Sequence, residues 1–340
     1  MLMLTSDDVL ALRLLGGVTN DEIIRLAHAC DVLQDALAIL GAMPADLGRL
    51  CGEQRERCSK QDVTIVTIVD AEYPPRLRQI ANPPSVLFVA GTLPDAAMHS
   101  VGVVGTRQCT HQYGLPVTRM LVADWARSGT VIVSGLANGI DTIAHEAAIQ
   151  NNTPTIAVIA SGIDRVTPKT ASDLARRISS GHGAVVSEHP CGVAALPPAF
   201  PARNRIIAAL SDAVVVIESK ARGGALITAE FALQQGKPLY AVPGPITSAR
   251  SEGCNALCAS GKAEMLLSSS SVKVVPQAGL LPIARLPMEL QSIDDGAPHY
   301  LDEFCAMFAC DVASARSKLL EFELLGFVTQ LAGERFVVRR

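Results

Sequence analysis

The chain has 340 residues, of which 49% are hydrophobic and 18% are charged, so it can bury a sizeable core and is long enough for two or three domains. The net charge of −4 argues mildly against a nucleic-acid-binding protein, and 4% aromatic residues leave room for only one or two base-stacking contacts. Charge on its own is a weak test, because a local basic patch is enough.

Secretion, membrane insertion and metal binding are not indicated. Residues 1–15 contain charged side chains that interrupt any signal peptide, and no apolar run reaches the roughly 18 residues of a membrane-spanning helix. The nine cysteines are scattered and show no Cys-x-x-Cys spacing. We therefore expect reduced thiols, no metal, no membrane contact and a cytoplasmic protein.

Residues 1–58 are predicted to form a small helical domain. Ser6, and then Thr19 or Asn20, are suitable N-caps, and Gly16-Gly17 separates the two apolar patterns. A helical pair broken by Gly-Gly resembles a SAM-like or helix-hairpin-helix module that grips a DNA backbone. A helical cap for packing or self-association is the simpler interpretation, and we favour it.

Residues 60–272 are predicted to form a doubly wound α/β domain. Short β-branched runs alternate with stretches long enough for helices, such as 115–127 and 140–150. Strands that are apolar throughout indicate a mostly parallel sheet covered on both faces. The runs lie at residues 63–69, 101–104, 131–133, 155–159, 184–186, 214–217 and 239–242.

The remainder of the chain divides into a linker at 273–297 and a last domain at 298–340. The linker is punctuated by Pro and Gly. In the last domain two predicted helices precede a hairpin around Ala332-Gly333-Glu334. Two helices followed by a two-stranded wing are typical of a winged-helix domain.

Candidate ligand-binding residues lie in the loops that follow the predicted strands, because open α/β sheets bind ligands at the carboxyl ends of their strands. Glycine, hydroxyl and arginine groups at these places suit phosphate, and a phenylalanine can stack on a base. The candidates are Gly105, Thr106, Arg107, Ser134, Gly135, Asn138, Ser161, Gly162, Phe200, Arg203, Asn204, Arg205 and Lys220.

Two features leave alternatives open. Arg203 and Arg205, just before an apolar helical run, either hold phosphates or pair with carboxylates within the fold. Asp141 is either a helix cap or, with His145 one turn later, part of a catalytic or metal site, and we favour a structural role for both.

The loops show no catalytic signature. None has the Gly-x-x-x-x-Gly-Lys-Ser/Thr pattern of a P-loop, and no Gly-x-Gly-x-x-Gly follows the first strands. We expect a binding protein without a catalytic residue or cofactor.

The ordered series of motifs resembles the DNA-processing protein A (DprA/Smf) family across roughly residues 60–265. The matching segments are Val103-Val104-Gly105-Thr106-Arg107, Ser134-Gly135-Leu136-Ala137-Asn138-Gly139-Ile140-Asp141, Ser187-Glu188, Phe200-Pro201-Ala202-Arg203-Asn204-Arg205, Ala241-Val242-Pro243-Gly244 and Gly253-Cys254-Asn255.

This resemblance implies a Rossmann-like protein that binds single-stranded DNA in a basic pocket, dimerises through the Rossmann-like domain, protects incoming DNA and loads the RecA recombinase during natural transformation. Carried over by motif, the residues that would line the DNA pocket are Gly105, Thr106, Arg107, Ser134, Gly135, Phe200, Arg203 and Arg205. The chain departs from the family at Gly223-Gly224-Ala225, where two hydroxyl donors are absent, and at Thr167-Pro168.

An alternative function is a sensor or enzyme for a nucleotide-sized ligand. Phosphoribohydrolases on a related fold carry a Pro-Gly-Gly-x-Gly-Thr segment near a catalytic glutamate, to which the segment 223–230, ending at Glu230, is faintly similar. The Pro and the third Gly are missing, so we rank this function second.

Overall fold

The computed structural model describes residues 4–41, 46–272, 290, 298–308, 310–324, 328–331 and 335–338. The chain divides into two compact units, Met1–Gln277 and Ala278–Arg340, and each is described by itself. No helix among the described residues is long and apolar enough to cross a membrane.

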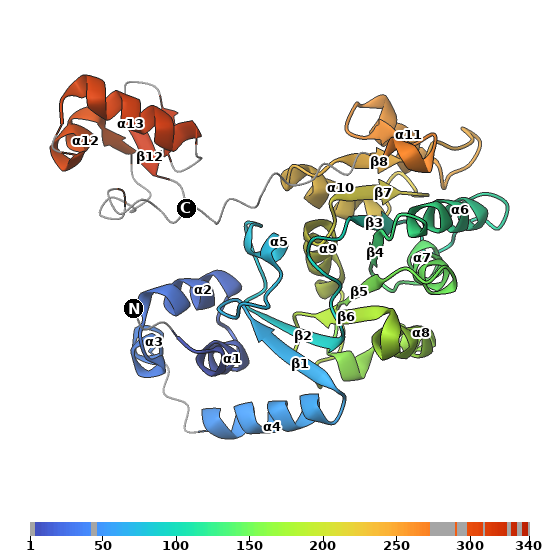
Figure 1. Ribbon diagram of the computed structural model, residues 1–340, viewed down its shortest axis with the longest axis horizontal. Coiled ribbons are helices and arrows are strands. Elements are labelled where there is room, and N and C mark those ends of the chain that lie inside the picture. Colours follow the sequence, from blue (N-terminus) through green and yellow to red (C-terminus); the bar gives the residue numbers. More distant parts are fainter. Residues whose placement is uncertain are drawn as a thin grey trace. The chain divides into compact units, whose positions relative to one another are not determined.

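The first unit is built on a nine-stranded sheet in the order β1-β2-β6-β5-β4-β3-β7-β8-β9 (Figure 1). The strands from β6 to β9 run parallel, and β2 joins them antiparallel through β6. This confirms the predicted doubly wound, mostly parallel Rossmann-like sheet. The strands are β1 (Val63–Thr67), β2 (Val86–Gly91), β3 (Ser100–Val104), β4 (Val131–Ser134), β5 (Thr155–Ile159), β6 (Gly183–Ser187), β7 (Ala213–Val216), β8 (Leu239–Ala241) and β9 (Glu264–Met265).

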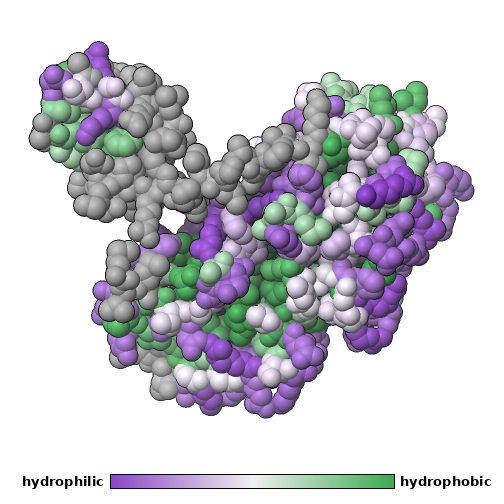
Figure 2. Space-filling view, in the orientation of Figure 1, coloured by the Kyte–Doolittle hydropathy of each residue, from purple (hydrophilic) through white to green (hydrophobic). Residues whose placement is uncertain are grey.

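Helices cover both faces of the sheet because alternate strand residues point to opposite sides and both sides are apolar. On one face pack α6 (Gly114–Ala126), α7 (Ile140–Gln150) and α8 (Ser172–Arg177), and on the other pack α5 (Pro75–Arg78), α9 (Ala199–Ala209) and α10 (Ala225–Gln234) (Figure 1). The outer sides of α6, α7 and α8 are mainly hydrophilic (Figure 2). A further helix, α11 (Glu252–Ala259), lies between β8 and β9 in the chain.

The N-terminal helices pack on the sheet instead of forming a unit of their own. They are α1 (Ser6–Leu14), α2 (Asn20–Ala29), α3 (Leu33–Ile39) and α4 (Leu47–Ser59). Leu10 and Ile23 share one apolar cluster with Phe88 of β2 and Val185 of β6. Thr5 and Thr19 are the N-caps, each completing a capping box, so the predicted cap at Ser6 falls one residue late.

A polar contact also ties these helices to the sheet unit. The Asn20 side chain accepts hydrogen bonds from the backbone N–H and hydroxyl of Ser85, at 3.1 and 2.8 Å, and its amide lies 3.4 Å from Glu188. The predicted boundary near residue 58 therefore separates helices from strands and does not separate two compact bodies. Whether the helices resemble a DNA-gripping module stays a prediction.

The second unit contains α12 (Leu301–Phe308), α13 (Val312–Leu324) and a three-stranded sheet of β10 (Pro298–Tyr300), β12 (Arg335–Val338) and β11 (Val328–Leu331). Phe304, Leu319 and Phe336 belong to its core. The two predicted helices and the hairpin strands are present, and the assignment to the winged-helix class stays a prediction. The tip of the hairpin, 332–334, and nearly all of the predicted linker lie outside the described residues.

Candidate nucleic-acid interface

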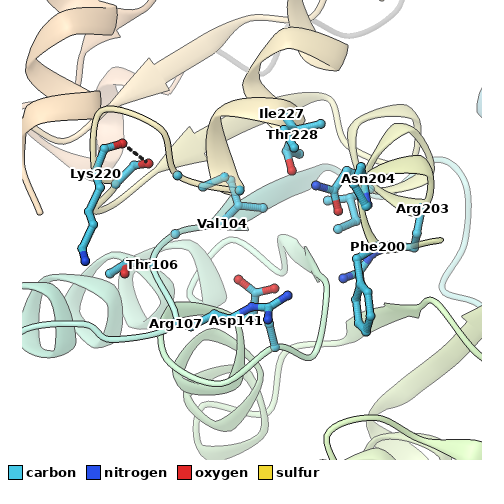
Figure 3. Close-up of a pocket in the computed structure, with 18 of the residues that line it drawn as sticks. Val104, Thr106, Arg107, Asp141, Phe200, Arg203, Asn204, Lys220, Ile227 and Thr228 are labelled. Atoms are coloured by element: carbon cyan, nitrogen blue, oxygen red, sulfur yellow. Dashed lines mark hydrogen bonds between the residues drawn. The ribbon is translucent and has the colours of Figure 1, made fainter. Parts of the chain in front are cut away.

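A pocket of 560 Å³ lies at the carboxyl ends of β3, β4 and β7, against the first turns of α9 and α10. Lys220 and Thr106 lie on one side of it in Figure 3, Phe200, Arg203 and Asn204 on the other, and Asp141 between them. The lining residues are Val104, Gly105, Thr106, Arg107, Ala137, Asp141, Pro197, Phe200, Pro201, Arg203, Asn204, Ile207, Ser219, Lys220, Gly223, Gly224, Ala225, Ile227 and Thr228. Seven of the thirteen predicted residues thus come together here.

Backbone contacts join the loops that form this pocket. The Thr106 N–H donates to Glu218 O at 2.7 Å, which ties the loop after β3 to the end of β7, and the Ile140 N–H donates to Thr106 O at 3.2 Å. Gly139 permits that second contact, because its φ is +87° and a Cβ there would lie 2.3 Å from Thr106 O. These backbone hydrogen bonds therefore fix the positions of the loops that border the pocket.

Two cations at the rim are available to a ligand. Arg107 and Lys220 are exposed, and neither makes an ion pair in the part of the chain that the structure describes. The Arg107 guanidinium stands over the Phe200 ring, with Cζ 5.5 Å from the ring centroid. A half-buried ring with one free cation over its face, and a second free cation across the pocket, suits a base next to its phosphates.

Arg203 lies at the floor of the pocket and is only 5% exposed. Its Nη1 donates to Gly135 O at 2.6 Å and also to Val158 O. Gly135 leaves room for this guanidinium, because a Cβ at this position would lie 2.5 Å from that Nη1. Burial lowers the pKa of Arg203 to about 10, a shift that nearby Asp141 opposes.

Asp141 does not cap α7, contrary to the simpler of our two expectations. Gly139 is the N-cap, and the Asp141 carboxylate accepts a hydrogen bond from Gly135 N–H at 3.1 Å, across the loop that follows β4. The side chain is 6% exposed, and this burial raises its pKa to about 6, although Arg203 pulls the pKa down.

His145 is a fully buried residue within the fold. Its Nδ1 lies 2.7 Å from the Thr155 hydroxyl, which itself donates to Ile132 O. Burial lowers the pKa of His145 to about 3, so the ring is neutral at physiological pH. It is not among the residues that line the pocket, in agreement with the structural role that we favoured.

Arg205 is placed away from the pocket. Its guanidinium forms a two-bond ion pair with Glu188, both contacts being 2.7 Å, and its Nε donates to Asn82 O at 2.8 Å. Arg205 pulls the pKa of the buried Glu188 carboxyl down against the effect of its desolvation. Of the two alternatives given for this arginine, the structure shows pairing with a carboxylate.

The five other predicted residues are not among the lining residues. Ser134 is buried and donates to Val103 O at 2.6 Å, while Gly135 contributes backbone to the floor. The buried Ser161 hydroxyl has no hydrogen-bond partner among the described residues, and Gly162 is buried. Asn138 is exposed and accepts from Thr170 at 3.4 Å.

Several residues that the structure brings to this edge are missing from the predicted site residues. Gly223, Gly224 and Thr228 line the pocket at the start of α10, and their position after β7 was the available signal. Lys169 is exposed next to Thr170 and makes no ion pair with any described residue. Its position shortly after β5 could have identified it.

The glutamate of the phosphoribohydrolase-like alternative does not reach the pocket. This residue, Glu230, is exposed on α10 and is not a lining residue. Within the described ranges no three His, Cys, Asp or Glu side chains are grouped to hold a metal ion.

The fold and the pocket together define a class: a Rossmann-like α/β protein with a cationic, ring-bearing pocket at the carboxyl ends of its parallel strands. Residues 64–275, more than half of the chain, match the family described as DNA recombination-mediator protein A. The chain belongs to this family, the DprA/Smf proteins.

Curated relatives extend this match. The chain is 42% identical to the DNA processing protein DprA of Streptococcus pneumoniae, over 61% of this chain and 72% of that protein. It is 42% identical to protein Smf of Escherichia coli over 53% of this chain, which spans about half (48%) of that relative's length, and 32% identical to protein Smf of Synechocystis over 83% of this chain and 81% of that protein.

Two solved structures are similar in fold and sequence. The crystal structure of DprA from Streptococcus pneumoniae covers 80% of this chain and 98% of its own, with a TM-score of 0.68 and 35% identity. A DNA processing protein A from Helicobacter pylori, whose structure is described for its single-stranded DNA binding mode, covers 63% of this chain and 94% of its own, with a TM-score of 0.56 and 27% identity.

Proposed function

We propose that this protein binds single-stranded DNA at the described pocket, without turnover, in order to protect incoming strands and load the RecA recombinase in the cytoplasm during natural transformation. The observation that carries the proposal is the pair of exposed cations without ion pairs in the described chain, Arg107 over the Phe200 ring and Lys220 across the same pocket, at the carboxyl edge of the sheet. Family membership and the single-stranded DNA binding of the Helicobacter pylori relative support it.

The placement of the cations favours a strand over a single nucleotide. Lys220 follows β7, Arg107 follows β3 and Lys169 follows β5, so that exposed positive charge is distributed along one edge of the sheet. A phosphate backbone running along this edge would meet them in turn, while single bases entered the pocket. Cations arranged in a row bind a flexible polyanion without reading its sequence.

Titration against a fluorescent single-stranded oligonucleotide, with the same sequence as duplex alongside, tests the proposal. We expect tighter binding of the single strand and a steep loss of affinity with salt, because bound phosphates release counterions. Weak or salt-insensitive binding would refute the DNA-binding function and would call for a screen of small nucleotides instead.

The finer parts of the proposal need their own measurements. Homodimerisation through the Rossmann-like domain predicts twice the chain mass in sedimentation equilibrium at micromolar concentration. If this protein loads RecA, adding it to single-stranded DNA that is coated with a single-strand-binding protein should shorten the lag before RecA filaments form. A monomer would refute the homodimer, and an unchanged lag would refute RecA loading. Neither result would contradict the DNA-binding function.

A further inference from the structure

Two thiols meet where the N-terminal helices pack on the sheet. Cys58 lies on α4, and Cys191 lies in the loop between β6 and α9, 133 positions further along the chain. The Cys58 S–H donates to Cys191 Sγ, with the two sulfur atoms 3.8 Å apart. The two residues are 2% and 3% exposed. A disulfide needs about 2.05 Å between its sulfurs, so the two atoms must approach by roughly 1.8 Å to become bonded.

Contacts on both sides of Cys191 keep this loop against α4. In the amide orientation that satisfies both of its polar groups, Gln54 of α4 accepts from Cys191 N–H at 2.7 Å and donates to Cys191 O at 3.3 Å. The next N–H along the loop, that of Gly192, donates to the Asp164 carboxylate at 2.7 Å. Gly192 has a φ of +95°, and a Cβ there would lie 2.5 Å from Arg57 Nη1. The thiol contact is therefore one of several that join the loop to α4.

The surroundings of Cys191 make it the more acidic of the two thiols. The hydrogen bond from Cys58 lowers the pKa of Cys191 below its ordinary value, against the effect of burial. The backbone N–H groups of Ile163 and Asp164 lower this pKa further. The contact with Cys191, together with burial, raises the pKa of Cys58. Because the thiolate is the reactive form of cysteine, Cys191 is the thiol that reacts first with an oxidant.

We propose that Cys58 and Cys191 are a peroxide-sensitive pair that closes a reversible disulfide, which fastens α4 to the loop between β6 and α9. The Cys191 thiolate attacks one oxygen of hydrogen peroxide and the O–O bond breaks, which leaves Cys191 as a sulfenic acid. The other oxygen departs as hydroxide and takes up the proton that the Cys191 thiol released. The Cys58 sulfur then attacks the Cys191 sulfur, and the Cys58 proton leaves with the second hydroxide as water. Two thiols are oxidised, and one peroxide is reduced to two waters.

Access and reversal follow from the place of the pair in the fold. Its cover is thin, because Arg57 and Val193 beside the two cysteines are exposed, so a brief opening of the loop admits a molecule as small as peroxide. In a reducing compartment thiol exchange reopens the bond, so the tie lasts only while an oxidant is present. The bond joins distant positions, and closing so long a loop restricts the unfolded chain and stabilises the fold.

Peptide mapping of the unaltered full chain tests the pair. The reduced protein is treated with hydrogen peroxide, its free thiols are alkylated in urea, and the digest is analysed by mass spectrometry. We expect one linked peptide pair, Cys58 with Cys191, which disappears on treatment with dithiothreitol. Oxidation should also raise the urea midpoint by about 1 M, because the closed loop is long. Complete alkylation of these two cysteines would overturn the proposal, and a linked pair without a rise in the midpoint would overturn the stabilising tie.

Single variants test the order of the two steps. In Cys58→Ala the Cys191 sulfenic acid lacks its partner and should be trapped by dimedone, whereas in Cys191→Ala we expect about tenfold less labelling of Cys58. Cys30→Ala is the matched control, because Cys30 is buried in the same apolar cluster and burial raises its pKa, and this variant should still form the disulfide. Stronger labelling of Cys58 than of Cys191 would overturn the order. If a variant does not fold, the peptide map of the unaltered chain decides the proposal alone.

Discussion

The rim and the floor of the pocket both carry cationic side chains, which are exposed at the rim and buried at the floor. Arg107 and Lys220 at the rim are exposed and without ion pairs in the described chain, whereas Arg203 and, beyond the floor, Arg205 are buried and bonded to backbone or to Glu188. Their hydrogen bonds join carbonyl groups and a carboxylate from separate loops, so these two arginines hold the loops in place. The rim cations contribute little to the fold and are free to meet phosphate.

The largest expected effect is a loss of stability when the buried ion pair of Arg205 is broken. Glu188→Ala leaves the Arg205 guanidinium buried without its counter-charge, and we expect a loss of about 3–5 kcal/mol in the free energy of unfolding. Urea denaturation followed by the fluorescence of Trp125, the single tryptophan, measures it. The double variant Arg205→Met/Glu188→Leu removes both charges and should recover much of the loss. A loss below 1 kcal/mol in the single variant would show that Arg205 is not held by this pair.

A smaller loss is expected at Gly135. Gly135→Ala places a Cβ 2.5 Å from Arg203 Nη1, a group that two carbonyl bonds keep in position, so we expect about 1–3 kcal/mol of destabilisation in the same urea assay. Gly224→Ala is the matched control, because nothing lies within 4 Å of the added Cβ. Equal effects of the two substitutions would mean that the Arg203 side chain moves aside freely.

Removal of rim charge should change binding and leave stability alone. We expect Arg107→Gln and Lys220→Gln each to weaken single-strand binding several-fold and to reduce the slope of log affinity against log salt by about 0.7, one phosphate contact on a single strand. Arg177→Gln is the control, since this exposed arginine ends α8 next to the amino end of β6, at the opposite edge of the sheet. Unchanged slopes in both rim variants would place the phosphates elsewhere.

The smallest expected effect is a pH dependence at the floor. With its pKa raised to about 6, Asp141 is ionised at pH 7.5 and mostly protonated at pH 5.5, so single-strand binding at the pocket should tighten a few-fold at the lower pH as this negative charge is lost. Nearby Arg203, with a pKa of about 10, and His145, with a pKa of about 3, keep their charge states over this range. A pH dependence that persists unchanged in Asp141→Asn would show that another group titrates.

Most of the sheet was predictable because its strands are short β-branched runs with apolar residues throughout. β2, residues 86–91, was missed among the prolines and glycines around it, although all but its last residue are buried. The loops after β3 and β7 were found from the rule that ligands bind at carboxyl ends of strands. Their residues Arg107 and Lys220 do reach the pocket.

The two arginines before the apolar helical run show where such reasoning stops. They are separated by two positions on α9, and residues two apart on a helix do not share a face. We predicted both arginines to lie before the helix and in the pocket; because α9 includes them, only Arg203 lines the pocket. Sequence could not identify Glu188 as the partner of Arg205, because the pairing depends on how β6 and α9 meet across the sheet.

The attachment of the N-terminal helices has a consequence for fragments of this protein. The family match begins at residue 64, which invites expression of the sheet unit alone. Such a fragment would strip the apolar cover from Phe88 and Val185 and take away the Asn20 side chain that meets both Ser85 and Glu188. The fragment would aggregate more readily, and the Glu188 carboxylate that pairs with Arg205 would lose its contact with Asn20. Removing the N-terminal helices would therefore also weaken the contacts that hold α9, the helix that carries Phe200 and Arg203 into the pocket.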